Sequence, residues 1–527
     1  MNNVHVRTHD PSRRAFLRQA GVMSALAGPA APLALNLAAI GQASAQSASD
    51  YRALVCLFLF GGNDSFNMVL PTDTTSWNAY TATRNQAPDP ISLMQPGTAP
   101  NTGAATGSPA RLGGVLPITP LNTQGRTFAL HPLMGTLQTM FNTDRRLAVV
   151  ANVGPLIQPT TKTQYGQSNH PKPKRLFSHN DQQNTWMAFE PEGATRGWGG
   201  RIGDMLLTSN TRAVFTAVSA SGNSVWLAGE GVRQYQVGTN GAIRLGTSGS
   251  GNGPGQVFGS AVVGSALLDI ARTARSAHVL ESEMAAVAQR SIDAESTLRG
   301  ALIPSNSPDF ALFGTPATNY SANNDPKLQY PNPLSGANSF NSLAQQFQIV
   351  ARMVDAGLRG ATGVRRQVFF VSLGGFDTHD LQNRNHADLM ARLAHALRYF
   401  DDTLGAMGAR NNVTTFTATD FGRTFTSNGD GTDHGWGSHQ FVMGGAVRGG
   451  DLYGEFPTLG LKNANNNRFD SSPDQIDNGS LLPKLSVDQM GATLARWMGV
   501  SDTDALAVFP NLGNFNASVR NLGFMNA

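Results

Sequence analysis

Six acidic and imidazole side chains stand in short turns, most of them flanked by glycine, near the ends of apolar segments. They are Asp64, Asp377, His379, Asp420, Asp433 and His434. Carboxylate and imidazole groups suit Zn²⁺ or Mn²⁺ and, with fewer histidines, Mg²⁺. Two ions about 3.5–4 Å apart would need roughly this many ligands and could clamp an in-line displacement at phosphorus. Each residue alone is also explained as a turn or capping residue, but the set predicts a two-metal hydrolytic centre.

Three apolar runs must position these turns. Residues 53–60, 367–373 and 413–419 are predicted strands, and an aspartate follows each of them within a few residues. Continuous apolar runs are typical of parallel strands that are covered on both faces. Because ligands bind at the carboxyl edge of such sheets, we predict an α/β fold with a mostly parallel central sheet and the site at that edge.

The rest of the chain supplies helices and long loops. Apolar residues at helical spacing predict helices within 131–141, 260–302, 341–358, 386–404 and 487–498. Residues 72–127 and 303–338 are rich in proline, asparagine, serine or glycine and are predicted to be long loop insertions. Because no repeat or clean boundary is visible, residues 46–527 are expected to form one domain.

The first 45 residues have the pattern of an export signal. Arg13 and Arg14 precede an apolar run from Ala20 to Ile40, and small residues follow up to Ala45. We expect transport by the twin-arginine machinery, cleavage near Ala45, and a periplasmic or secreted product. No later segment approaches the roughly 18 apolar residues of a membrane span.

The charge tells against a nucleic-acid-binding protein, and the cysteine content excludes an intramolecular disulfide. Four arginines against one aspartate in residues 1–45 account for +3 of the net charge of +4, so the remaining chain is nearly neutral. It lacks the basic tract that nucleic-acid binding requires. Cys56 is the only cysteine, so no intramolecular disulfide forms. Its place inside an apolar run predicts a buried, inert thiol.

Several motifs together resemble the bacterial domain-of-unknown-function family 1501. They are Gly61-Gly-Asn-Asp-Ser-Phe-Asn67, Phe177-Ser-His179, Leu373-Gly-Gly-Phe-Asp-Thr-His379, Thr417-Ala-Thr-Asp-Phe-Gly-Arg-Thr424 and Gly431-Thr-Asp-His-Gly435. That family is exported, often by twin-arginine signals, and is similar to the alkaline phosphatase and sulfatase superfamily. The resemblance implies an alkaline-phosphatase-like three-layer α/β/α sandwich with two metal ions at its strand ends. It implies no substrate.

The resemblance also implies which residues of this chain are the metal ligands. The first-strand ligand of the superfamily falls on Asp64, and its Asp-x-x-x-His pair resembles Asp377 with His379. The shorter spacing here leaves His386 as the alternative partner. Asp420 stands directly after a strand, where family members commonly carry Glu. Asp433 and His434 match the Asp-His-Gly motif in letters, with His434 as the later, separate histidine.

Ser178 is the expected nucleophile. It matches the family's Ser-His pair and opens a predicted helix, where partial positive charge favours an alkoxide. Ser65, beside Asp64, is the alternative, and a plain N-cap is the non-catalytic interpretation. His179 is expected to orient substrate or act as an acid, and Arg423 to bind non-bridging oxygens. No Cys/Ser-x-Pro-x-Arg segment occurs, which tells against a formylglycine sulfatase.

These features predict an exported metal-dependent hydrolase of phosphate or related anionic esters, either small or linked to a polysaccharide. Two other classes stay open. One is a non-catalytic protein that binds a surface or a polysaccharide on the same fold. The other is a partner in a secretion or assembly system, with the predicted loops 72–127 and 303–338 as docking surfaces.

Overall fold

The computed structural model describes residues 51–242, 255–274, 276 and 278–526. The predicted export signal and its cleavage site lie outside these residues. Among the helices of the described part, none combines the length and the apolar character needed to cross a bilayer.

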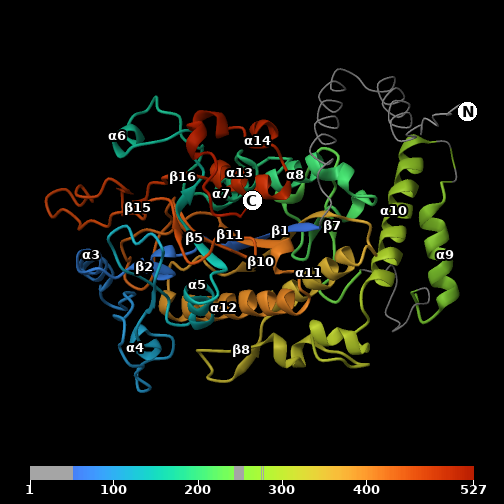
Figure 1. The fold of residues 1–527 in the computed structure, drawn as a ribbon, viewed down its shortest axis with the longest axis horizontal. Helices are drawn as coiled ribbons and strands as arrows, with labels where there is room; N and C mark the ends of the chain where they lie inside the picture. Colours follow the sequence, from blue (N-terminus) through green and yellow to red (C-terminus); the bar gives the residue numbers. More distant parts are fainter. Residues whose placement is uncertain (1–50, 243–254, 275, 277, 527) are drawn as a thin grey trace, which may run out of the picture.

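A mixed, largely parallel sheet runs through the middle of the molecule (Figure 1). Its strand order is β13 (Leu452–Tyr453), β5 (Leu147–Gly154), β12 (Ser438–Gly444), β11 (Val413–Thr419), β1 (Arg52–Phe60), β10 (Arg366–Gly374), β6 (Ala217–Ser219) and β7 (Tyr235–Gln236), while β16 (Leu485–Ser486) also pairs with β5. β1 is parallel to both β10 and β11. β12 is antiparallel to both of its neighbours. The predicted α/β class and mostly parallel sheet are confirmed.

Strand β1 shows why the sheet is covered on both faces. Successive side chains of a strand point to opposite faces, and every residue from Ala53 to Leu59 is buried. Leu54, Cys56 and Phe58 belong to one apolar core, whereas Val55 and Leu57 belong to another. Burial raises the pKa of the Cys56 thiol well above its ordinary value, so the thiol stays protonated, as its apolar setting predicts.

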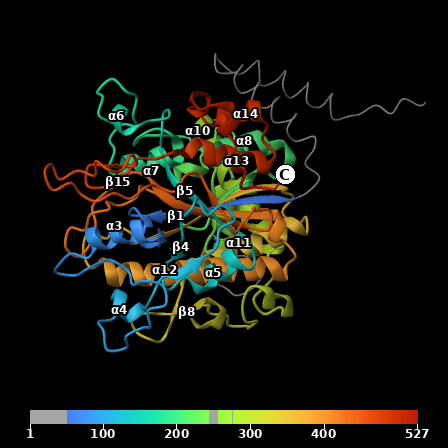
Figure 2. The ribbon, with the colours of Figure 1, turned by 60° about the vertical axis from the view of Figure 1, so that its left-hand side comes forward.

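Helices lie against both faces of the sheet. α5 (Gly135–Asn142), α11 (Ser342–Leu358) and α12 (Gln382–Ala406) contribute to the core that contains Val55. α7 (His179–Ala188), α8 (Trp198–Leu206), α13 (Val487–Met498) and α14 (Asp502–Val508) contribute to the core that contains Phe58. Figure 2 shows these two groups of helices on opposite sides of the strands.

Three segments differ from their sequence-based prediction. The predicted loop from 303 to 338 contains the short strand β8 (Gln329–Pro331). The long helical span after Ser260 is two helices, α9 (Ala261–Arg272) and α10 (Val279–Ala301). The segment predicted as a loop from 72 to 127 contains helices α3 (Thr74–Arg84) and α4 (Pro109–Leu112) and the small sheet strands β3 (Leu116–Ile118) and, just after, β4 (Phe128–Leu130). α3 has a polar, threonine-rich sequence without aliphatic periodicity, and the side chain of Asp73 caps its start.

Three of the histidines that are buried in the described part of the chain have a depressed pKa. Burial lowers the pKa of His386 to about 4 and that of His439 to about 3, and it lowers the pKa of His131 well below its ordinary value. These side chains are neutral in the folded protein, although they would bind protons more readily in the unfolded chain.

We expect the free energy of unfolding to fall as the pH drops from about 6.5 towards 4. The unfolded state then binds more protons than the folded state, so stability that is complete above pH 6.5 is lost on acidification. His386 alone contributes on the order of 3 kcal/mol to this loss. Asp488, whose pKa burial raises to about 6, has the opposite trend. Urea unfolding across this pH range measures the effect, and a flat profile would contradict it.

Candidate metal centre

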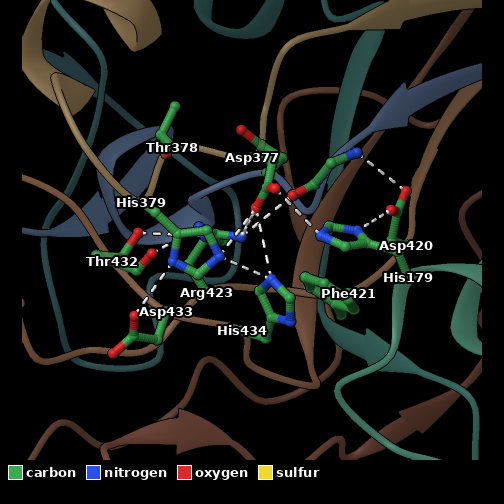
Figure 3. Close-up of polar contacts among 12 residues, drawn as sticks. His179, Asp377, Thr378, His379, Asp420, Phe421, Arg423, Thr432, Asp433 and His434 are labelled. Atoms are coloured by element: carbon green, nitrogen blue, oxygen red, sulfur yellow. Dashed lines mark hydrogen bonds and ion pairs between the residues drawn. The ribbon is translucent and has the colours of Figure 1, made fainter.

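The turns after three parallel strands meet at one edge of the sheet. Asp377 follows β10 and Asp420 follows β11, and Gly61 follows β1 between them. Because β12 runs antiparallel, the loop that enters it lies at the same edge and carries Asp433 and His434. Figure 3 shows Asp377, His379 and His434 pointing towards one another, with His179 joining them from α7. Asp420 and Asp433 contact histidines of this group.

Asp377 lies at the centre of the group. Its Oδ2 is 3.4 Å from His179 Nε2, and its Oδ1 is 3.2 Å from His379 Nε2 and 3.5 Å from His434 Nε2. The Nε2 atoms of His379 and His434 are 2.9 Å apart. Ligand atoms of His179, Asp377 and His434 all lie within 4.8 Å of one another, so one ion could contact all three.

Each imidazole is held from behind at Nδ1. The acceptors are Asp420 Oδ2 for His179 at 2.7 Å, Asp433 Oδ1 for His379 at 3.2 Å, and the Phe177 carbonyl for His434 at 2.7 Å. A carbonyl or carboxylate oxygen accepts, so Nδ1 carries a proton, and Nε2 of each ring points into the centre, where its lone pair can bind a cation when the ring is neutral.

The Nε2 atoms of His179, His379 and His434 are not supplied with hydrogen-bond donors for their lone pairs. His179 Nε2 is buried and makes no hydrogen bond. Two imidazole lone pairs 2.9 Å apart, as in His379 and His434, repel each other unless a proton or a cation lies between them. The arrangement therefore has the electrostatic character of a cation site.

Asp420 supports this centre from behind His179. Its carboxylate is fully buried and accepts hydrogen bonds from the Gly61 amide at 3.2 Å and the Gln183 side chain at 2.7 Å, besides His179. Gln183 lies one helical turn after His179, so both reach the same carboxylate. These bonds engage both oxygens of Asp420, which acts here as the carboxylate that orients a histidine.

Replacing Asp420 with asparagine is expected to weaken metal binding by about 10–100-fold, because an amide group can donate to His179 Nδ1 and so move the ring proton to Nε2. Competition titration of Zn²⁺ with a chromogenic chelator measures this change, and a thermal melt verifies that the variant is folded. An unchanged affinity would show that Asp420 does not set the orientation of His179.

Arg423 holds Asp377 in place. Its fully buried guanidinium donates to Asp377 Oδ1 at 2.9 Å, to the Gly61 carbonyl at 3.2 Å, and to the carbonyl and hydroxyl of Thr432 at 2.5 and 3.3 Å. The sequence assigns Arg423 to substrate oxygens, but this geometry favours a positioning role.

Burial, hydrogen bonds and neighbouring charges shift the pKa values of His179, His434 and Asp377. The hydrogen bond that His179 donates to Asp420 raises the pKa of His179, although partial burial opposes it. Burial lowers the pKa of His434, which keeps that ring neutral. Partial burial acts to raise the pKa of Asp377, but hydrogen bonding and attraction to Arg423 outweigh it, so the pKa is lowered and the carboxylate is ionised at neutral pH.

Asp64 lies outside this group. Its carboxylate is fully buried in an ion pair with Arg84, at 2.6 Å from Oδ2 to a guanidinium nitrogen, and it also accepts from Gln382 at 2.6 Å and from the Phe66 amide at 3.2 Å. The structure therefore gives the predicted first-strand ligand a cationic partner of its own. Ser65, the alternative nucleophile, is completely buried.

The structure decides between the two histidines proposed as partners of Asp377. His386 is buried in α12 and lies 3.2 Å from Asn63 Oδ1, whereas His379 contacts Asp377 directly. Both Asp377 and His379 are about two-fifths exposed, so the centre opens to solvent on their side.

Ser178 is the N-cap of α7, directly before His179. Its hydroxyl donates to Asp181 Oδ2 at 2.9 Å and caps no backbone amide. Phe177 has φ of 70°, in the left-handed region, and its carbonyl binds His434. Sequence reasoning missed this carbonyl and Gln183, although the spacing of Gln183 from His179 was a usable signal.

Residues 271–508 match the profile of a family described as "Protein of unknown function (DUF1501)". The match supports the family resemblance. It covers Asp377, His379, Asp420 and His434, while His179 precedes the matched residues. No curated protein matches the chain.

Proposed function

We propose that the chain is a metal-dependent hydrolase of phosphate or related anionic esters, with a divalent ion at Asp377. The observation that carries this proposal is the convergence of His179, His379 and His434 on Asp377, each through Nε2, with every Nδ1 held by an acceptor. Metal-binding histidines are typically fixed in this way by a second hydrogen bond.

The donor set fits Zn²⁺ or Mn²⁺ better than Mg²⁺, because Mg²⁺ prefers oxygen ligands. The buried Nε2 of His179, which makes no hydrogen bond and lies 3.4 Å from Asp377 Oδ2, fits an ion as well. In the described part of the chain, the acidic and imidazole residues form one such group. We therefore propose one ion here, because no second group of three acidic or imidazole side chains lies as close together among those residues. A bound divalent ion would act as a Lewis acid and stabilise the charge that develops on ester oxygens.

The chain's own residues supply orientation and an anion site. Arg423 keeps Asp377 ionised and fixed. The N-cap Ser178 makes no hydrogen bond to a backbone amide of α7, and we propose that amide groups of the first turn bind an anionic group beside His179. Ser178, at the same helix start, is our candidate nucleophile, and Asp181, which accepts its hydroxyl hydrogen bond, is placed to take up the proton.

The proposals for the finer fold, the export route and the location of the protein rest on the sequence. A largely parallel sheet covered by helices on both faces is compatible with an alkaline-phosphatase-like sandwich, which we propose as the finer fold. We also propose that the protein is exported by the twin-arginine machinery and acts on small or polysaccharide-linked esters in the periplasm or outside the cell.

A panel of phosphomonoesters, phosphodiesters and sulfate esters tests the activity. The purified chain is assayed after dialysis against chelator and again after addition of Zn²⁺, Mn²⁺ or Mg²⁺. We expect turnover of at least one ester class that depends on added Zn²⁺ or Mn²⁺ and is lost in Asp377→Asn. Hydrolysis that is equal with and without metal, or equal in the variant, would contradict the proposal.

A further inference from the structure

The helices α9 and α10 contact each other and project from one end of the molecule (Figure 1). α9 is rich in alanine, valine, leucine and isoleucine, and Gly264 is its only residue classed as buried. A helix with so many apolar residues is normally covered. Its composition is therefore unusual for a helix that faces solvent within a single copy of the chain.

Exposed apolar side chains form a stripe on each helix. They repeat at positions i, i+4 and i+7, which places them on one face. On α9 they are Val263 (42% exposed), Leu267 (38%) and Ile270 (55%), and on α10 they are Leu280 (70%), Met284 (73%) and Val287 (48%). α9 ends at Arg272 and α10 begins at Val279, so Ile270 and Leu280 are only ten residues apart in the sequence. The two helices also contact each other.

The charged residues beside these stripes are paired within the hairpin. Arg272 pairs with Asp269, and Arg290 pairs with Glu283 at 2.8 Å. Together the two helices carry five acidic and three basic side chains and no lysine. Helices that lie on a membrane surface are instead rich in Lys and Arg on their polar face. The chemistry of the hairpin thus favours an apolar protein surface over a membrane as its partner.

We propose that the apolar stripes of α9 and α10 together form the interface of a homodimer, in which two hairpins pack about a two-fold axis as a four-helix bundle. A two-fold interface uses the same patch on both copies, and an apolar patch with internally paired charges is complementary to itself. Together with Phe258, Val262 and Val279, the two stripes offer an area on the order of the 800 Å² that each partner buries in a stable interface.

Sedimentation velocity of the full chain over a wide concentration range tests the dimer. We expect the wild type to sediment as a dimer and Met284→Glu to raise the dimer dissociation constant at least about 100-fold, because association would bury an unpaired charge. Leu461→Glu, at a side chain 54% exposed in a loop outside the hairpin, is the matched control and should remain dimeric. A wild type that is monomeric throughout, or a Met284→Glu dimer as tight as wild type, would overturn the proposal.

Two further measurements distinguish a dimer interface from a misfolded variant and from a lipid-binding face. Because Met284 is mostly exposed, the circular dichroism of Met284→Glu should match that of wild type, so loss of the dimer is not loss of the fold. Mixing Met284→Glu with Met284→Arg should restore dimers that neither variant forms alone. Wild type that stays monomeric and floats with phosphatidylglycerol vesicles would assign the face to lipid and overturn the homodimer.

Discussion

Asp377→Asn is expected to lower the affinity for Zn²⁺ by more than about 100-fold, beyond the loss typical of residues that only support a ligand. The carboxylate of Asp377 is the one group that all three histidines face through Nε2. An asparagine keeps the shape of the side chain and can still accept from Arg423. It removes the negative charge that Asp377 offers to a divalent ion, so metal-dependent ester hydrolysis should fall together with affinity.

Isothermal titration with Zn²⁺ and the ester assay measure the two effects on the same preparations. Asp380→Asn is the matched control, because Asp380 is an exposed aspartate three residues further along the same turn and lies outside the cation group. We expect it to bind Zn²⁺ as the wild type does. Equal affinity in wild type and Asp377→Asn would remove Asp377 from the centre and, with it, the geometric basis of the proposed function.

Arg84→Met is expected to lower the free energy of unfolding by about 3–5 kcal/mol, because it leaves a buried carboxylate without its cation. Both side chains of the Arg84–Asp64 pair are completely buried. Arg84 also donates to Asn67 and to the carbonyls of Phe425 and Thr424, so its loss opens several contacts between α3 and the loop after β11.

Chemical denaturation measures this loss, and Arg196→Met is the control. Arg196 forms an exposed pair with Glu230, and such pairs contribute less than about 1 kcal/mol. The double variant Asp64→Leu/Arg84→Met should regain part of the stability, since it removes the charge that Arg84→Met leaves unpaired. If Asp64→Asn lost the metal but kept the stability of the wild type, Asp64 would be a metal ligand, as the sequence predicts.

The sequence could predict where the site forms because strand ends are local features. The apolar runs of β1, β10 and β11 are long enough to identify buried strands, and parallel strands bring their carboxyl ends to one edge. That rule alone brings Asp377 and Asp420 to the same edge. The residues that follow a strand are visible in the chain, so their grouping needs no knowledge of distant partners.

The roles within the site depended on partners far away in the chain. Asp420 and Asp64 look alike in sequence, since each follows a buried strand. His179, 241 residues away from Asp420, makes Asp420 the support of an imidazole. Arg84, on a helix without aliphatic periodicity, makes Asp64 half of an ion pair. Whether such an aspartate binds a metal or supports another residue depends on side chains that are distant in the sequence, and no local pattern encodes those pairs.

Elemental analysis of the purified wild-type chain, beside His434→Ala, tests the central claim most directly. We predict about one equivalent of zinc or manganese per wild-type chain after gel filtration, and a large loss of that metal in His434→Ala, because His434 Nε2 faces both Asp377 and His379. Wild-type protein that remains free of transition metal after incubation with excess Zn²⁺ or Mn²⁺, or His434→Ala that retains a full equivalent, would contradict the metal centre.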